Sequence, residues 1–506
     1  MESLADTKWD VVISGTGLQQ SLLALALSRS GKNILHIDPN DFYGDAEAAL
    51  GLQDVDEWVP KNSAATPVPG SGFAAAEVER MDAVGDSPSL SASRAYSIAL
   101  APQLIHTKSK LLSQLVSSKA FRQVEFLAVG SFYILQPAES GPSLNRVPST
   151  REDVFSSTAI PARAKRSLMK FLKFALDYES ETNSESWKSR ADEQLDTFLA
   201  SDFKLDDRLR ADIMSLTLTP DGLVSVRDGL AAINRHMTSM GLFGGGFAAV
   251  YPKWGGLSEV AQVGCRAGAV GGAVYMLGTG LREVKRTEDG AETPLTVALS
   301  NGMTVNAQSL VQCPQGGDAG GGGLHLRRLT AIVGSSLSPL FETVVEGAPT
   351  PAVAVVAVPA GSVAGDSGVT SRYPIYAMAH SSDTGECPSG QCVIYLSTVS
   401  TPASKDVLDK ALSSLLEAAV PSGQKPPPCL YKLSYEQTAT TDRTNVDDDG
   451  PIVNIPPLPL DLSFNDGVMD CVQKAWESVK ADDDTHVSEY MKFDDREGAE
   501  DNDFYD

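Results

Sequence analysis

Positive charge is scarce in this sequence of 506 residues. It contains 41 Lys and Arg against 65 Asp and Glu, which gives a formal net charge of −24. Such an excess of carboxylates repels nucleic-acid phosphates and the anionic headgroups of lipids. We therefore exclude a nucleic-acid binder. A hydrophobic content of 42% and a charged content of 21% are those of a chain that folds.

Long hydrophobic runs are also missing. The longest apolar stretches are about ten residues or fewer. One example is the nine residues from Pro351 to Pro359, which have proline at both ends. A membrane-spanning helix needs roughly 20 apolar residues. The first residues show no basic segment followed by an apolar one, so we expect no secretory signal. These absences predict a soluble, cytoplasmic protein.

Cysteine occurs, but not in a pattern that indicates disulfides or a metal site. There is no CxxC pair, and no histidine lies at zinc-ligand spacing. The six cysteines are Cys265, Cys313, Cys387, Cys392, Cys429 and Cys471. We expect reduced structural thiols, with metal ligation as the lesser alternative.

Familiar catalytic motifs are absent as well. The sequence has no GxSxG, no P-loop and no HExxH motif, and its six histidines are far apart. We therefore expect no metal and no catalytic residues. An enzyme built on this chain would need chemistry that none of these motifs shows.

The first forty residues contain the clearest local pattern. Residues 9–14 are a short apolar run, residues 15–17 are Gly-Thr-Gly, and residues 18–30 are rich in Leu and Ala. A second apolar run, 33–37, ends at Asp38. A strand, a glycine turn, a helix and a second strand form the βαβ opening of a dinucleotide-binding fold.

The glycine motif itself is incomplete. Gly15 and Gly17 satisfy the first two positions of the dinucleotide fingerprint, but Gln20 stands where a third glycine lets the helix approach the strand. Asp38 has the spacing of the fingerprint's acidic residue. The glycine-aspartate segment expected late in a flavin-binding chain is missing between 446 and 479. Two interpretations stay open: a working dinucleotide site, or a retained fold that has lost its ligand.

Composition divides the chain into four parts. We predict an α/β domain whose first part covers 1–148 and whose second part covers 246–480, with a helical domain over 149–245 between them. Residues 53–93 are rich in Pro, Gly, Ser and Ala and are expected to be a loop-like insertion. Residues 481–506 carry 11 acidic and 2 basic residues and are expected to be a disordered acidic tail.

Apolar periodicity supports the helical domain. An amphipathic helix is predicted over 163–179, because apolar residues recur there at i, i+3, i+4 and i+7. These residues are Leu168, Phe171, Leu172 and Ala175. Farther along, two alternating runs between 295 and 312 meet at Asn301-Gly302, which predicts a β-hairpin.

Four separated segments carry a family resemblance. They are Gly15 to Leu18 with Leu35 to Gly44, Arg94 to Tyr96 with 121–132, Arg146 to Thr150 with Phe171 to Phe174, and Tyr251 to Gly256 with Glu259, Gln262, Arg266 and Tyr275 to Leu277. In this order they resemble the Rab escort proteins and Rab GDP dissociation inhibitors, which use a flavoprotein-like scaffold without flavin. A residue other than glycine at position 20 is usual in that family. Residues 451–479 are similar to the C-terminal part of the fungal-type escort proteins, also called component A of Rab geranylgeranyltransferase.

The resemblance implies a fold and a role. The fold is of the α/β (α+β) class, an FAD/NAD(P)-binding-like scaffold with mixed sheets and a smaller all-helical domain, and it holds no cofactor. The implied role is that of a non-catalytic escort, which binds GDP-bound Rab GTPases and presents them to the α/β heterodimer of the geranylgeranyltransferase. It then shields the geranylgeranyl lipid of the client in an apolar groove and delivers the client to membranes, which implies a cytoplasmic protein with transient peripheral membrane contact.

The resemblance also implies functional residues. By motif position, Tyr43, Glu259 and Arg266 are implied contacts of a Rab-binding platform, with Arg94 as a fourth. Gly15, Gly17 and Asp38 become a vestigial dinucleotide loop. Structural alternatives remain: Tyr43 as a core tyrosine, and Glu259 with Arg266 as an ion pair along one helix face.

Two other functions compete with the escort. A GDP dissociation inhibitor recycles Rab that is already prenylated and does not engage the transferase. A flavin-dependent oxidoreductase belongs to a different class. The length of the chain, the 53–93 insertion and residues 475–477 favour the escort.

Overall fold

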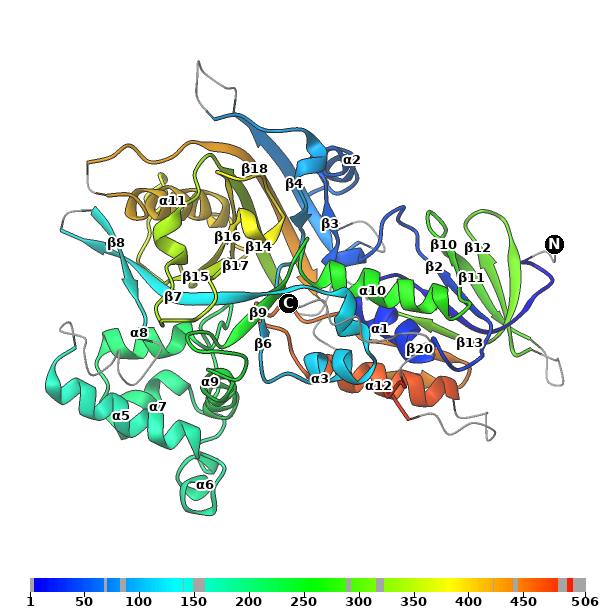
Figure 1. Cartoon of the computed structure of the whole chain (residues 1–506), viewed down its shortest axis with the longest axis horizontal. Helices are drawn as coiled ribbons and strands as arrows, with labels where there is room; N and C mark the ends of the chain where they lie inside the picture. Colours follow the sequence, from blue (N-terminus) through cyan, green and yellow to red (C-terminus); the bar gives the residue numbers. More distant parts are fainter. Residues whose placement is uncertain are drawn as a thin grey trace.

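Two sheets and a lobe of helices make up the computed structural model (Figure 1). It describes residues 4–67, 71–81, 88–139, 141–148, 160–287, 293–314, 323–421, 423–439, 445–480 and 489–494. Figure 1 places the first sheet on the right, the second at the upper left and the helical lobe at the lower left.

The first sheet contains eight strands among the described residues. They are β1 (Lys8–Ser14), β2 (Ile34–Ile37), β10 (Val274–Met276), β11 (Leu281–Arg286), β12 (Leu295–Leu299), β13 (Thr304–Gln312), β19 (Asp447–Asp449) and β20 (Ile452–Asn454). The order β10-β2-β1-β13 is parallel throughout, β20 joins β13 in parallel, and β12 and β11 follow β13 as antiparallel strands. The predicted hairpin at Asn301-Gly302 is confirmed as the β12–β13 pair.

Three helices pack together beside this sheet: α1 (Leu18–Leu27), α10 (Leu257–Val270) and α12 (Gly467–Lys480). All ten residues of α1 are buried, because the helix lies beneath both of the others and against the strands. The predicted strand, glycine turn, helix and second strand are therefore confirmed as β1, α1 and β2. A helix buried on every side shows no amphipathic pattern, and only its Leu and Ala content predicted it.

The second sheet contains ten strands among the described residues, in the order β4-β18-β14-β17-β16-β15-β7-β9-β6, with β8 beside β7. Their bounds are β4 (Phe73–Arg80), β6 (Ile105–His106), β7 (Phe126–Ala138), β8 (Gly141–Arg146), β9 (Ala249–Pro252), β14 (Leu324–Val333), β15 (Val353–Val358), β16 (Ile375–Ser381), β17 (Cys392–Val399) and β18 (Cys429–Ala439). Helix α11 (Ser404–Ala418) packs against one face of the second sheet. A small sheet of β3 (Ala49–Leu50) and β5 (Ile98–Ala99) packs on the opposite face.

The helical lobe contains α5 (Ala162–Leu176), α6 (Glu181–Lys188), α7 (Leu195–Phe203), α8 (Asp207–Ser215) and α9 (Val226–Ser239). It has its own apolar core, separate from those of the sheets. Helix α5 confirms the amphipathic helix predicted from periodicity. Residues 149–159, with which the predicted helical domain begins, lie outside the described residues.

The prediction of a loop-like insertion over 53–93 is wrong for much of its length. Helix α2 (Leu52–Lys61) buries Leu52, Val55 and Trp58, and β4 pairs with β18. Alanine hid β4, which reads Phe-Ala-Ala-Ala-Glu-Val-Glu-Arg and lacks the large apolar residues of an alternating strand. Helix α2 does have apolar residues at helical spacing, Leu52, Val55 and Trp58, but the composition of the whole 53–93 region concealed this short signal.

The prediction of a disordered tail is wrong for residues 489–494. Met491 is 1% exposed, Tyr490 lies edge to face with Trp476 of α12 at 5.4 Å, and the Arg29 guanidinium lies 4.6 Å from the Phe493 ring centre. Three apolar side chains among the carboxylates are enough to hold this segment on the fold. The rest of 481–506 lies outside the described residues.

Two further findings concern the helices and the cysteines. None of the helices in the described part of the chain combines the length and the hydropathy that a membrane crossing requires. All six cysteines are free thiols, as predicted.

Candidate functional site

A side chain from α1 closes the glycine turn between β1 and α1. Gly15 has a φ of +94°, and Gly17 precedes the first residue of the helix. A Cβ placed on Gly15 would lie 3.2 Å from Gln20 Nε2, and one on Gly17 would lie 3.1 Å from Gln20 Oε1. The Gln20 amide thus fills the space through which a backbone approaches a pyrophosphate.

Asp38, at the end of β2, binds the same turn. Its Oδ2 accepts hydrogen bonds from the backbone N of Thr16 at 2.6 Å and from Thr16 Oγ1 at 2.7 Å. Burial raises the pKa of this carboxyl, and the hydrogen bonds from Thr16 and Asn40 lower it. A carboxylate that holds the loop in this way is not free to bind a ribose hydroxyl.

A second carboxyl occupies the N-terminus of α1. Glu47, in the short helix η1 (Asp45–Glu47), is buried, and its Oε2 accepts a hydrogen bond from the backbone N of Leu18 at 3.2 Å. The pKa of Glu47 is raised to about 8, chiefly by burial and also by the charge of Asp45, while the Leu18 N–H acts in the opposite direction. A helix N-terminus is where folds of this type bind phosphate, and here the chain's own carboxyl lies there.

A dinucleotide does not fit this arrangement. Its pyrophosphate would have to displace the Gln20 amide and lie against the Glu47 carboxyl, and its ribose would meet an Asp38 already bound to Thr16. Gly15 and Asp38 keep the backbone geometry of a dinucleotide-binding loop, but the space for the pyrophosphate is filled. We therefore assign no flavin or nicotinamide chemistry to these residues.

Two of the four implied platform residues lie on helix α10. Glu259 is half-buried and Arg266 is exposed, two helical turns apart, which is about 10 Å along the axis. The Arg266 Nη1 donates to Gln123 Oε1 at 3.3 Å, and among the described residues no ion pair joins Glu259 to Arg266. Burial raises the pKa of Glu259, and the charge of Arg266 lowers it. Both side chains are therefore at least partly accessible on this face.

Tyr43 lies beside the same helix. A Cβ placed on Gly44 would lie 3.2 Å from Ser258 Oγ, and the Tyr43 ring is edge-on to Tyr275 with ring centres 6.2 Å apart. The tyrosine is half-buried, and burial raises the pKa of its hydroxyl. Its ring is therefore anchored while one side stays open, unlike a core tyrosine.

Arg94 lies near the N-terminal end of α10, the end that also carries Glu259. It belongs to the short helix η2 (Ser93–Ala95) and is exposed. Three residues later, Ser97 Oγ donates to the carbonyl of Trp254 at 3.0 Å, just before α10 begins. The structure thus brings Tyr43, Glu259 and Arg266 around one helix and places Arg94 near its N-terminal edge.

Trp254 is a surface residue that the sequence reasoning did not single out. It is 53% exposed and has a φ of +72°, and Lys253 Nζ lies 5.2 Å from its ring centre. A Cβ on Gly385 would lie 2.3 Å from the Trp254 ring, so only glycine fits beneath it. The sequence signal was an aromatic residue followed by Gly255-Gly256, both of which have positive φ.

A buried hydrogen-bond network holds the backbone beneath Trp254. Glu386 accepts from the Tyr251 hydroxyl at 2.7 Å and bonds His380 Nδ1 at 2.6 Å. The carbonyl of Thr384, two residues earlier, accepts from the Trp254 backbone N at 2.8 Å. Burial raises the pKa of Tyr251, so its hydroxyl stays a donor. The network therefore connects residues 380–386 with residues 251–254 and fixes the backbone that carries Trp254.

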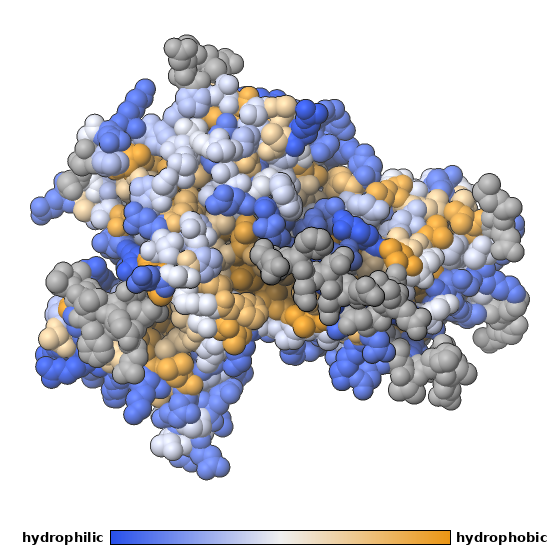
Figure 2. Space-filling view, viewed as in Figure 1, coloured by the Kyte–Doolittle hydropathy of each residue, from blue (hydrophilic) through white to orange (hydrophobic). Residues whose placement is uncertain are grey.

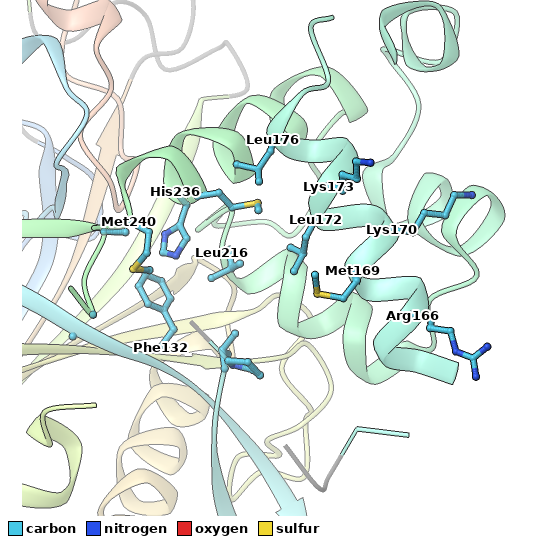
Figure 3. Close-up of a pocket in the computed structure, with 16 residues that line it drawn as sticks. Phe132, Arg166, Met169, Lys170, Leu172, Lys173, Leu176, Leu216, His236 and Met240 are labelled. Atoms are coloured by element: carbon cyan, nitrogen blue, oxygen red, sulfur yellow. The ribbon is translucent and has the colours of Figure 1, made fainter. Parts of the chain in front are cut away.

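An apolar cavity of about 940 Å³ opens between the helical lobe and the second sheet (Figure 3). Figure 2 shows hydrophobic residues gathered in the hollow between these two parts of the molecule. The lining comes from α5, from α9 and the loops before and after it, and from β7. It includes Phe132, Met169, Leu172, Leu176, Leu216 and Met240. Of the four residues that predicted the amphipathic helix, Leu172 lines the cavity, whereas Leu168, Phe171 and Ala175 belong to the core of the lobe.

The floor of the cavity contains a neutral histidine. His236 is 7% exposed, and its ring centre lies 5.2 Å from Phe132 and 5.7 Å from His106. Burial, together with the charge of Arg235, lowers the pKa of His236 to about 4. The ring is therefore uncharged at neutral pH, in keeping with an apolar ligand.

A second hollow, of about 830 Å³, lies between α3 (Lys110–Ser117) and the end of α9. Three large apolar side chains on its rim are exposed by 55–59%: Val116, Leu242 and Phe243. The short helix η3 (Ala120–Gln123) touches both α3 and α10, and Gln123 contacts Arg266. The second hollow therefore lies between the platform face of α10 and the cavity beside α9.

No group of three or more His, Cys, Asp or Glu in the described residues is arranged to hold a metal ion. The cysteine thiols near the site are held protonated, because burial raises the pKa of Cys265 to about 11 and that of Cys313 to about 12. The arrangement therefore offers surfaces and cavities for binding.

Comparisons with known proteins agree on one family. A family model described as "GDP dissociation inhibitor" matches residues 5–72 and 76–315. A relative from Saccharomyces cerevisiae, named "Rab proteins geranylgeranyltransferase component A", is 32% identical over 416 residues, or 81% of this chain. The matched region spans 64% of that relative, so the chain spans less than two thirds of its length.

Solved structures show the same fold. A Rab GDI from Plasmodium falciparum superposes with a TM-score of 0.63 at 17% identity, covering 94% of this chain and 98% of that one. An oxidoreductase from Methanosarcina mazei superposes with a TM-score of 0.58 at 12% identity, covering 93% and 100%. The predicted α/β class with a flavoprotein-like scaffold is confirmed.

Proposed function

The chain belongs to the GDP dissociation inhibitor family, and from that premise we propose that it is a Rab escort protein, an accessory component of Rab geranylgeranyltransferase without an active site of its own. It binds GDP-bound Rab GTPases and presents them to the α/β heterodimer of the transferase. It then holds the geranylgeranylated product and delivers it to membranes, as a cytoplasmic protein with transient membrane contact. The name and identity of the yeast relative support this proposal.

The apolar cavity is the observation that carries the proposal. Its volume of about 940 Å³ is at the upper end of small-molecule sites and suits one long isoprenoid chain. A chain of twenty carbons exposes on the order of 15 kcal/mol of transfer free energy in water, at ~0.8 kcal/mol per CH₂. Shielding in this cavity recovers much of that free energy, and the neutral His236 adds no buried charge.

The platform supplies protein recognition at a distance from the lipid. Tyr43 and Trp254 are aromatic anchors of the kind that dominate protein interfaces, and Glu259 and Arg266 add opposite charges beside them. The segment of the client that joins the GTPase to its lipid would cross the second hollow, whose apolar rim lies between the two sites.

The filled dinucleotide loop supports an accessory role over a flavin-dependent oxidoreductase. Gln20 and Glu47 occupy the pyrophosphate position. The absorbance spectrum of the purified protein tests this: we expect no flavin bands, and stoichiometric flavin would overturn the accessory role.

A GDP dissociation inhibitor is the second candidate, because the superposed Rab GDI is covered over 98% of its length. A prenylation assay with purified transferase and unprenylated GDP-bound Rab separates the two. We expect this protein to stimulate prenylation. Extraction of prenylated Rab from membranes without any stimulation would overturn the escort in favour of the inhibitor.

A further inference from the structure

Helix α5 is basic within an acidic protein. Its fifteen residues contain five Lys and Arg and no Asp or Glu, whereas the whole chain has a net charge of −24. The helical lobe as a unit, residues 160–245, is close to neutral, with 12 Lys and Arg against 13 Asp and Glu. Positive charge is therefore concentrated on the helix that walls the cavity.

Three of these cations lie at the mouth of the cavity. Arg166, Lys170 and Lys173 follow one another at i, i+4 and i+7, which places them on one face of α5. All three are exposed, and Figure 3 shows their side chains directed away from the cavity, while Leu172 and Leu176 on the same helix border it. We name Arg166, Lys170 and Lys173 the cationic rim.

The cationic rim has no ion pair among the described residues, and Lys170 only approaches the ring of Phe203, at 5.4 Å. Other cations of the same lobe are neutralised locally: Arg190 pairs with Glu193 and Asp202, and Arg210 pairs with Asp196 and Asp207. The difference indicates that the charge of the rim is available to an anionic partner.

We propose that the cationic rim binds the anionic headgroups of the membrane that receives the lipidated client. Charge complementarity supports this partner, since a basic amphipathic helix is typical of membrane-surface contact. Screening limits the influence of the remaining acidic surface to about 10 Å at 0.1 M salt, so the local charge decides the contact. Leu176, which is 50% exposed, adds an apolar contact at the same edge.

The position of the cationic rim would place a bound membrane next to the cavity. A membrane bound to α5 lies at the mouth of the cavity, so an isoprenoid chain can pass into the bilayer without full exposure to water. The acidic remainder of the chain then favours departure once the client has left. Membrane binding by the rim is a property of the unloaded chain, and only its role in delivery rests on the proposed function.

Vesicle flotation of the full-length, unloaded chain tests the inference. The vesicles are phosphatidylcholine alone, or phosphatidylcholine with about 30% phosphatidylserine, at about 0.1 M salt. The triple variant Arg166→Glu, Lys170→Glu, Lys173→Glu is compared with a control of equal charge change, Lys61→Glu, Lys425→Glu, Lys474→Glu. All six side chains are exposed, so both variants are expected to fold.

We expect the wild type and the control to bind only the anionic vesicles, and to bind them less tightly as salt rises. The rim variant is expected to bind them roughly a hundredfold more weakly, because each Lys or Arg near an anionic surface contributes about fivefold. Equal binding by the rim variant and the control, or no binding by the wild type, overturns the inference.

A transferase binding assay with the same variants tests the alternative partner of the cationic rim, an acidic protein surface. Loss of transferase affinity in the rim variant, with unchanged vesicle binding, assigns the rim to an acidic protein surface and overturns the membrane contact. Failure of the wild type to stimulate prenylation overturns the proposed function alone, because flotation uses neither client nor transferase.

Discussion

Glu47 shows how one buried carboxyl replaces a ligand. In a dinucleotide-binding fold the N-terminus of the first helix attracts a phosphate, whereas here Glu47 accepts the Leu18 N–H and is protonated for most of the time at neutral pH. Burial raises the pKa of Glu47 more than the N–H at the start of the helix lowers it. The residue that fills the site therefore adds no net negative charge to the core.

The raised pKa of Glu47 gives a pH-dependent prediction. Because the folded-state pKa of about 8 lies above the ordinary value of 4.5, the stabilising contribution is complete below about pH 4.5 and is lost as pH rises through 8. The variant Glu47→Gln cannot ionise and still accepts from Leu18 N. At about pH 9 we expect its free energy of unfolding to exceed that of the wild type by a few kcal/mol, at ~1.4 kcal/mol per pKa unit.

Urea unfolding at several pH values measures this difference. Glu185→Gln, on the exposed side of α6, is the matched control and is expected to follow the wild type. A Glu47→Gln variant that tracks the wild type across the whole pH range would show that this carboxyl does not titrate in the folded protein.

Arg266 tests the platform at the residue scale. Among the described residues its one hydrogen bond is a 3.3 Å contact to Gln123, so Arg266→Ala should leave the fold intact. We expect the affinity for GDP-bound Rab to fall by at least about 1 kcal/mol, or fivefold in Kd, as for an interface hot spot. Titration calorimetry compares it with Arg282→Ala, an exposed arginine on β11; equal affinities for the two variants would remove Arg266 from the platform.

At the scale of elements, α5 performs two tasks with adjacent faces. Leu168, Phe171 and Ala175 pack into the core of the lobe, whereas Met169 and Leu172 line the cavity. The periodicity that predicted the helix did not separate these faces, because both are apolar. Only the position of β7 and α9 relative to the helix decides which side meets a cavity.

The variant Leu172→Asp tests the cavity. A carboxylate in an apolar wall must be desolvated when lipid enters, at a cost of several kcal/mol. We expect the affinity for geranylgeranylated Rab to fall by roughly a hundredfold or more, which is at least ~3 kcal/mol. A fluorescent prenylated client reports the Kd.

The control for this variant is Leu223→Asp, because Leu223 is 62% exposed in the loop before α9 and lies outside the cavity lining. Unprenylated Rab is titrated in parallel to separate the lipid contribution. If Leu172→Asp bound the prenylated client as tightly as the control, the lipid would have to lie elsewhere.

At the scale of the whole molecule, residues 489–494 pack onto the layer of helices beside the first sheet. Tyr490, Met491 and Phe493 pack against α12 and α1, and Arg29 Nη1 donates to the carbonyl of Asp494 at 2.6 Å. Truncation after Lys480 removes these contacts. We expect the free energy of unfolding to fall by about 2–4 kcal/mol, the value of one or two buried apolar side chains.

Truncation after Asp494 is the matched comparison, because it removes 495–506 and keeps the packed segment. Thermal unfolding of the two truncated chains is expected to differ, with the lower Tm for the chain that ends at Lys480. Identical Tm values would mean that the segment contributes nothing to stability.

The sequence by itself determined the elements whose signals are local. The βαβ opening, the β12–β13 hairpin and helix α5 follow from periodicity and from turn residues such as Asn301-Gly302, because backbone preference depends on near neighbours. The family resemblance rested on motifs of the same local kind. The alanine-rich strand β4 gave no such signal, and the short pattern of α2 was concealed by the Pro, Gly, Ser and Ala content of the residues after it, so both were missed.

The tertiary structure decided the contacts between distant residues. Glu47 meets Leu18 across 29 positions, Glu386 meets Tyr251 across 135, and Arg266 meets Gln123 across 143. Which apolar side chains form the core and which line a cavity likewise depends on how whole elements pack. Local sequence thus specified the parts of this protein, and packing specified the loop that excludes a dinucleotide and the cavity proposed for the lipid.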